Sequence, residues 1–184
     1  MIDSIFRHFA LIAFITYWSV VLVMIHKLWG GRHVTISLHA SSNATARKLF
    51  AVLVILETTL YLLFLFKWFI PYYGMSFLFG VLVILTSVGH YITGIIPETR
   101  GLSRAIHRRA SYWSVALFVP ELIIISTTLS ISAIVRTIAF ALSVALIYAW
   151  YLFLFRLNRR EDILDQALYI STLPIVLILA AYIR

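Results

Sequence analysis

The chain has no cysteine, which excludes disulfides, thiolate metal sites and cysteine nucleophiles. Charge is also scarce: charged residues occupy 12% of the 184 positions, whereas they make up about a quarter of a typical soluble domain. No polar stretch is long enough to form a separate soluble domain, so we expect no nucleic-acid binding despite the net charge of +8. An integral membrane protein is the class that fits this composition.

Hydrophobic residues make up 62% of the chain and gather in six continuous apolar runs. Each run is long enough to cross the hydrocarbon layer of about 30 Å as an α-helix. The runs are His8–Trp29, Lys48–Ile70, Met75–Ile96, Ala110–Ala133, Thr137–Leu157 and Ile163–Ile183. The connections between them are short, and the first run has no A-x-A-like cleavage site, so we expect it to be retained. The sequence predicts an all-α fold, a single domain over residues 1–184 that forms a bundle of six transmembrane helices.

Lysine and arginine are divided unevenly between the two faces of such a bundle. One face has Lys27, Arg32, Arg47, Lys48, Arg100, Arg104, Arg108, Arg109, Arg156, Arg159 and Arg160. The opposite face, with both termini, has only Arg7, Lys67, Arg136 and Arg184. Basic residues accumulate in cytoplasmic loops. We therefore expect both termini outside, the three larger loops in the cytoplasm, and the plasma membrane as the location.

Three ionisable residues interrupt three different runs at a similar depth. At about 1.5 Å per residue, Glu57, His90 and Glu121 lie roughly 10–17 Å from the cytoplasmic boundary. A charge near the bilayer centre costs about 2.5–3.5 kcal/mol on insertion scales, so these side chains should face the bundle interior. We expect them to form a polar ligand-binding pocket in the cytoplasmic half, with His107 at its edge. The alternative is that each is satisfied locally, as Glu57 would be by Tyr61.

A pocket of this kind predicts a protein that binds or transports a small ligand or a lipid. One alternative is an intramembrane enzyme that acts on lipid and uses the same residues as metal ligands or acid–base groups. Another is a non-catalytic subunit whose buried charges pair with a second chain. No H-E-x-x-H or other fixed ligand spacing occurs, and His26 and His90 have only their depth in common as haem ligands. We therefore assign no catalytic residue, no metal and no cofactor, and favour a protein that is not an enzyme.

The loop after the third run is rich in arginine. The basic residues around its turn are Arg100, Arg104, Arg108 and Arg109. Glu98 is free to pair with one of them or with His107. Topology alone accounts for such a cluster, and the sharper expectation is that it binds anionic lipid headgroups, at about 1 kcal/mol per basic residue near the surface. The predicted partners are thus the bilayer and its anionic lipids.

Small residues predict where neighbouring helices approach closely. Ser76 and Gly80 mark such a face on the third run. Ala141, Ala145 and Ala149 mark one on the fifth. These are predicted packing features, and no ligand is assigned to them.

Two short motifs flank the arginine-rich loop. The third run ends in Gly94-Ile95-Ile96-Pro97, a G-x-x-P, and the fourth is opened by His107-Arg108-Arg109-Ala110, a His followed closely by Ala. On these motifs and the six-span layout, the chain resembles the membrane-protein family known as "domain of unknown function 998". That family often has Phe before the proline and Asp shortly after it, whereas this chain has Ile96 and Glu98. The resemblance implies six spans and implies no reaction.

Overall fold

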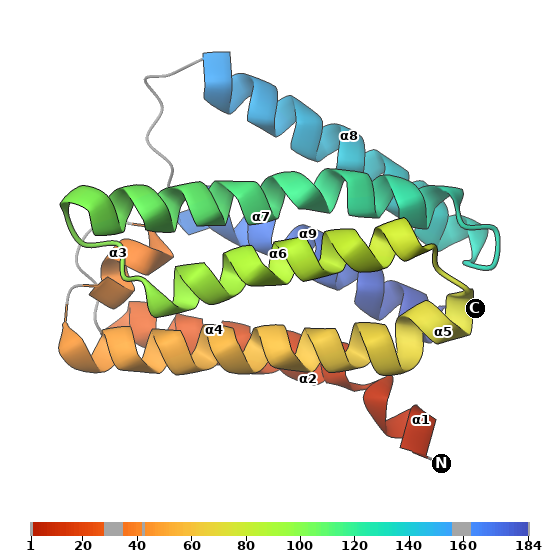
Figure 1. The fold of residues 1–184 in the computed structure, drawn as a ribbon, viewed down its shortest axis with the longest axis horizontal. Helices are drawn as coiled ribbons and strands as arrows, with labels where there is room; N and C mark the ends of the chain where they lie inside the picture. The colour runs from red at the N-terminus through yellow and green to blue at the C-terminus, as the bar shows by residue number, and fades with distance from the viewer. Residues whose placement is uncertain (1, 28–34, 42, 156–162, 184) are drawn as a thin grey trace.

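The computed structural model describes residues 2–27, 35–41, 43–155 and 163–183, and every regular element in these segments is helical (Figure 1). In chain order the elements are α1 (Ile2–Phe6), α2 (Phe9–Lys27), α3 (Ile36–Ser41), α4 (Ala44–Phe64), η1 (Leu65–Phe69), α5 (Ile70–Tyr73), α6 (Phe77–Ile95), α7 (Gly101–Thr127), α8 (Ala133–Phe155) and α9 (Ile163–Tyr182).

Five stretches of the described chain are long and apolar enough to cross a membrane. They are Ser4–His26, Ala44–Tyr73, Phe77–Ile95, Gly101–Thr127 and Ala133–Tyr151. A shorter apolar stretch, Gln166–Tyr182, forms most of α9. Since helices satisfy their own backbone hydrogen bonds, a bundle of this kind is the construction of a helical membrane protein.

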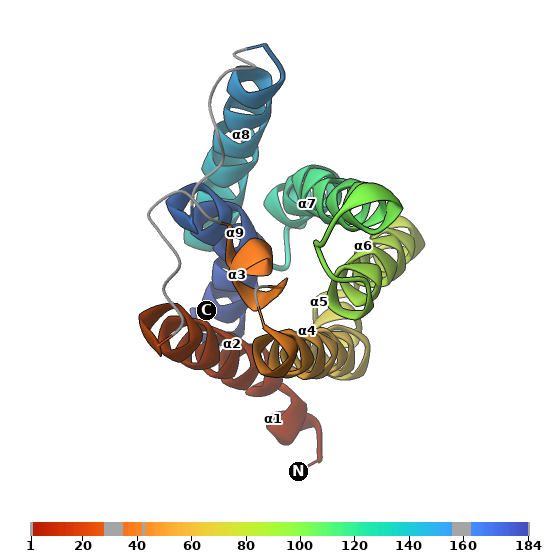
Figure 2. The ribbon, with the colours of Figure 1, turned by 90° about the vertical axis from the view of Figure 1, so that its left-hand side faces the viewer.

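The long helices are arranged as a ring. Seen along the bundle, α2, α4, α6, α7 and α9 follow one another around the ring, and α3 lies across its near end (Figure 2). α6 packs against both α4 and α7, and α2 packs against α4. α8 packs mainly on α7 and diverges from the bundle toward its own C-terminal end (Figure 1). Residues distant in sequence are thus brought together inside the ring.

The helix of the second apolar run continues past its predicted end at Ile70. Pro71 has no N–H, and its ring would clash with the carbonyl of Lys67, four residues earlier. The helix widens there into η1, in which the Ile70 N–H reaches back five residues to the carbonyl of Leu65. It then runs on as α5 and ends at Gly74, whose φ of 62° suits a residue without a Cβ. The proline widens this helix and does not end it.

The helix of the fourth run begins earlier than the hydropathy predicts. The expected start was Ala110, but α7 begins at Gly101, which has a φ of 60°. Its first turns carry Arg104 and Arg108, whose long stems let their charged heads reach a polar environment. Helix formation does not require apolar side chains, so α7 extends beyond its apolar run.

Two apolar clusters fill the bundle. The larger joins α4, η1, α7, α8 and α9 around buried residues such as Phe64, Phe69 and Leu122. The smaller joins α2, α3 and α4 around Tyr17 and Phe50. Along α4, the buried polar residues Glu57 and Thr58 lie between the last residue of the smaller cluster, Val54, and the first buried residue of the larger one, Phe64.

The end of the bundle that holds the termini is closed by polar contacts to α9. The Tyr73 hydroxyl donates a hydrogen bond to the Ala180 carbonyl, and Arg7 Nε donates to the Ala181 carbonyl at 2.7 Å. The Arg7 guanidinium also lies 5.9 Å from the ring centroid of Trp68. These contacts tie α5 and the segment between α1 and α2 to the end of α9.

Two glycines let α6 approach its neighbours. A Cβ on Gly89 would overlap the Ser114 hydroxyl oxygen of α7 and lie 3.0 Å from the Ala110 carbonyl oxygen. A Cβ on Gly94 would lie 3.1 Å from the Val54 side chain of α4. These distances are shorter than ordinary van der Waals contacts, so a Cβ at either position would force a neighbouring group to shift.

The small residues singled out from the sequence do not mark these contacts. The nearest atom to a Cβ on Gly80 would lie at 3.8 Å, which is an ordinary contact, and Ser76 is the N-cap of α6. Ala141 and Ala145 are exposed on the outer face of α8. The prediction was therefore wrong for Gly80, because a small residue shows where approach is permitted and not where it occurs.

Candidate functional site

Three titratable side chains from three helices line one cavity. Glu57 of α4, His90 of α6 and Glu121 of α7 contribute to a cavity of about 440 Å³, a volume that includes its open side. Glu57 and Glu121 are 8% and 1% exposed. The structure therefore brings together the three residues that the sequence placed at one depth.

The polar groups of this cavity are poorly satisfied. Glu121 Oε1 accepts a hydrogen bond from Thr86 Oγ1 at 2.6 Å. Within the described part of the chain, the Thr58 hydroxyl and the Tyr61 hydroxyl are buried and have no hydrogen-bond partner. A buried unsatisfied polar group costs about 1–3 kcal/mol. Such groups call for a water molecule or a ligand in the cavity.

Glu57 and His90 have no local hydrogen-bond or ion-pair partner in the described part of the chain. Neither side chain makes a hydrogen bond or ion pair to another described residue, and the Tyr61 hydroxyl, the partner considered for Glu57, is itself unpaired. The His90 ring packs edge-to-face on Phe118, with centroids 5.8 Å apart. The local-satisfaction alternative thus has no support at these two positions.

A second, larger cavity continues from the first toward α3. Its volume is about 840 Å³, open side included, and Glu57, His90 and Ile170 line both cavities. Its other polar lining residues are Ser37, Thr93, Ser111 and Gln166. Its aromatic lining residues are Tyr17, Phe50, Tyr112, Trp150 and Tyr169. The two cavities thus adjoin at Glu57, His90 and Ile170, and their mostly apolar walls carry these few polar side chains.

A proline inside α9 adds a further polar group beside the cavities. Pro174 has no N–H to donate to the carbonyl of Ile170, four residues earlier. Ile170 lines both cavities and Pro174 lines the smaller one. The two cavities therefore adjoin at a position where a helix carbonyl lacks its usual donor.

α3 closes the end of the larger cavity. The Ile36 N–H donates to Gln166 Oε1 of α9 at 2.9 Å, and Thr35 Oγ1 donates to Glu98 Oε2 at 3.2 Å. His39 of α3 is buried, and burial lowers its pKa below the usual 6.5. The short helix is thus held on both sides, by α9 and by the loop after α6.

Glu98 organises the arginine-rich loop. It is 3% exposed and accepts from Arg108 Nε at 2.6 Å, and Arg104 Nε lies 3.6 Å from the same oxygen. The sequence left two partners open for Glu98, an arginine or His107, and the structure pairs it with arginine. Arg100 and Arg109 are exposed at the same end of the bundle.

His107 does not line either cavity. Its Nδ1 lies 2.6 Å from the Ile96 carbonyl oxygen, and its buried Nε2 has no hydrogen-bond partner among the described residues. The side chain therefore joins the start of α7 to the end of α6, beside the Glu98 loop and away from Glu57.

No metal centre is assembled in the described segments. Within them, no three side chains of His, Asp or Glu are placed so that they could hold a metal ion. Glu57, His90 and Glu121 thus line one cavity, but they are not placed so that all three could bind one metal ion.

Several lining residues were not predicted from the sequence, although two of them left a signal. Thr86 lies four residues before His90 and Thr93 three residues after it, which puts both on the helix face of His90. Polar residues on the same helix face as a predicted site residue are therefore candidates for its lining. The aromatic lining carries no comparable signal, since aromatic residues are frequent throughout the chain.

Fold and site together define a helical membrane protein with an internal cavity whose mostly apolar wall carries a few titratable side chains. Comparison with protein-family models, with curated proteins and with solved structures found no match to this chain. Function must therefore be argued from the cavity itself.

Proposed function

We propose that this protein is a six-span membrane protein that binds a small ligand or lipid in its internal cavity and passes it through the cytoplasmic half. The observation that supports this is the cluster of Glu57, His90, Thr58 and Tyr61, whose polar groups share a cavity and lack hydrogen-bond partners in the described chain. An ionisable residue inside a membrane protein marks a binding site or pathway by default.

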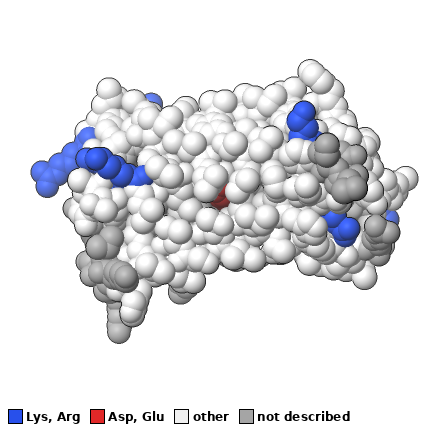
Figure 3. Space-filling view, turned by 90° about the horizontal axis from the view of Figure 1, so that it is seen from below, with Lys and Arg blue, Asp and Glu red and all other residues white. Residues whose placement is uncertain are grey.

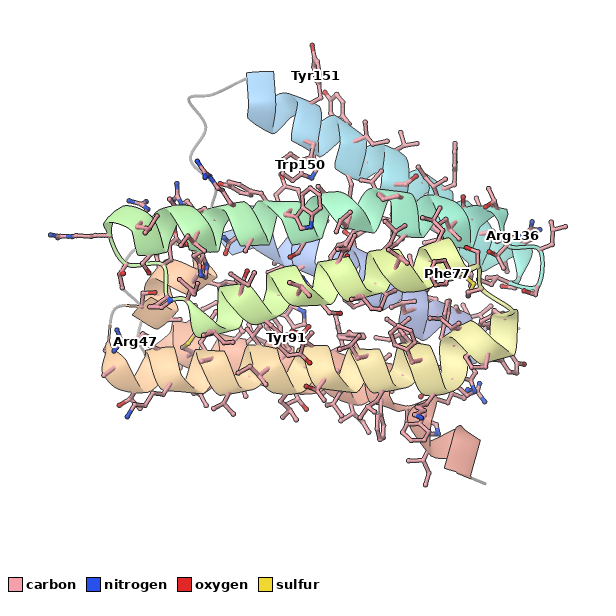
Figure 4. The ribbon with its side chains drawn as sticks, viewed as in Figure 1. Arg47, Phe77, Tyr91, Arg136, Trp150 and Tyr151 are labelled. Atoms are coloured by element: carbon pink, nitrogen blue, oxygen red, sulfur yellow. The ribbon has the colours of Figure 1, made fainter. Side chains whose placement is uncertain are left out.

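The distribution of charge supports the proposed topology, in which α9 is the sixth span and both termini lie outside. On the apolar flank in Figure 3, basic residues gather at the two ends of the molecule, and a small acidic patch lies at mid-length. Arg47 and Arg136 lie at opposite ends (Figure 4). The end with Arg47 also carries the arginines of the Glu98 loop, and an excess of basic residues is typical of the cytoplasmic side.

Two further expectations are part of this proposal. Arg100, Arg104 and Arg109 are exposed at the proposed cytoplasmic end, where they can meet anionic lipid headgroups, while Arg108 is partly engaged by Glu98. The resemblance to the "domain of unknown function 998" family remains part of the proposal as well, and it adds no activity.

The absence of cysteine in the natural sequence makes a direct test of the cavity possible. Thr93→Cys and Val88→Cys lie on the same helix, but Thr93 lines the larger cavity whereas Val88 is 49% exposed on the outer face. Thiols react as thiolates, which form in water and not in hydrocarbon. In vesicles, a small polar thiosulfonate should modify Thr93→Cys at least tenfold faster than Val88→Cys.

The same experiment can reject the proposal. Equal, slow modification at the two positions would mean that the cavity is closed to water and to polar ligands. Leu102→Cys, in the first turn of α7 and 76% exposed, serves as the reference for a hydrated thiol.

A further inference from the structure

We infer that the ligand of the larger cavity is an organic cation, a small quaternary or protonated amine, with Glu57 as its counter-ion. This inference rests on the proposed function and specifies the chemical class of the ligand. The charges, the aromatic residues and the backbone around the cavity each support it.

The charges of the lining favour a cation. Among the described residues, no lysine or arginine lines either cavity, whereas Glu57 lines both and Glu121 lines the smaller one. Glu121 already accepts a hydrogen bond from Thr86, whereas Glu57 has no partner among the described residues. An anion would enter a low-dielectric space without a counter-charge, and a buried unpaired charge is strongly unfavourable. A cation would instead supply the partner that Glu57 lacks.

The aromatic residues favour a cation of the ammonium type. Tyr17, Tyr112, Trp150 and Tyr169 line the larger cavity together with Glu57, and they come from α2, α7, α8 and α9. Trp150 points from α8 toward α7, whereas the neighbouring Tyr151 points away from the bundle (Figure 4). Tyr112 and Trp150 meet edge-to-face at 5.9 Å. Aromatic faces grouped around a carboxylate are how proteins recognise quaternary ammonium groups.

The remaining lining is consistent with a compact cationic head. The Ile170 carbonyl, which Pro174 leaves without a donor, adds a partial negative charge at the junction of the two cavities. Arg104 and Arg108 lie at the end of the bundle that α3 covers and would repel a cation. The buried carboxylate of Glu98 lies beside both and offsets part of their charge.

The test uses protection of Thr93→Cys in vesicles, with choline and 3,3-dimethylbutan-1-ol as probes of the same shape with and without a charge. Choline at saturation should slow modification at least tenfold, and the neutral alcohol should have less than a twofold effect. In the Thr93→Cys background, Glu57→Gln should abolish protection by choline. Trp150→Leu should raise the choline concentration for half-protection at least tenfold, and its matched control, Tyr151→Leu, should leave it unchanged.

Each other outcome overturns one of the two proposals. If Thr93→Cys is not modified in the absence of a probe, the accessible cavity and the proposed function are wrong. If it is modified and the two probes protect equally, or neither protects, the cavity stands and the cationic ligand is wrong. Protection that persists in both Glu57→Gln and Trp150→Leu overturns the assigned counter-ion and aromatic wall, even if one variant alone folds poorly.

Discussion

Replacing a glycine of α6 with alanine should change stability in opposite directions at Gly89 and Gly80. Gly89→Ala would place a Cβ against the Ser114 hydroxyl and 3.0 Å from the Ala110 carbonyl oxygen, so α6 and α7 must separate. Overpacking of this kind costs about 1–3 kcal/mol. Gly80→Ala meets only an ordinary contact at 3.8 Å and should gain up to about 1 kcal/mol from helix propensity.

Unfolding of the two alanine variants in a denaturing detergent titration, followed by circular dichroism, measures this difference. A Gly89→Ala variant as stable as Gly80→Ala would mean that α6 and α7 do not approach closely at this point.

The candidate site was only partly predictable at this level of detail. Glu57, His90 and Glu121 were visible because a charge inside an apolar run is costly wherever it occurs. Depth along each helix followed from residue counting, but rotation about the helix axis did not. His107 was therefore expected at the pocket, whereas its ring turns to the Ile96 carbonyl. Whether Tyr61 reached Glu57 also depended on rotation, which only the packed structure gives.

The loop between α6 and α7 is held in place by one buried carboxylate, that of Glu98. Arg108→Met would leave Glu98 without its hydrogen bond of 2.6 Å, and we expect a loss of about 1–3 kcal/mol, because Arg108 is itself 39% exposed and partly screened. Arg104→Met removes only the pair at 3.6 Å, at a cost of less than about 1 kcal/mol.

Hydrogen exchange of the backbone amides in residues 98–101 reports this loss directly, because local opening exposes them. Exchange should accelerate in Arg108→Met and change little in Arg104→Met. Equal acceleration in both variants would show that the loop is held by net charge and not by the specific bond to Glu98.

Helix ends were less predictable than helix existence. Pro71 looked like part of a connection, but the preceding helix absorbs it by widening into η1. Arg104 and Arg108 made the start of α7 too polar for a hydropathy argument, yet polar residues form helices readily. The sequence predicted six membrane-spanning helices; the all-helical fold is confirmed, and five helices of the described chain are long and apolar enough to span, while the sixth span stays a prediction.

The distribution of lysine and arginine predicts which end of the molecule faces the cytoplasm. On intact cells, an impermeant maleimide should label Lys67→Cys and Arg136→Cys, which lie at the proposed outer end. Arg47→Cys and Arg104→Cys should react only after the membrane is permeabilised, because basic loops stay in the cytoplasm. Gel-shift detection of the label suffices, and the inverse pattern would reverse the proposed orientation.

The glycine contacts of α6 also divide the cavity into two unequal halves. Gly94 holds α6 against α4 and Gly89 holds it against α7, so the helices that carry Glu57, His90 and Glu121 form one tightly packed slab. The opposite side is made of α2, α3, α8 and α9, of which α8 stands partly apart from the bundle (Figure 2). For a ligand bound as proposed, we therefore expect the spacing of Glu57 and Glu121 to stay fixed, and differences in ligand size to be accommodated mainly by movement of α2, α3, α8 and α9.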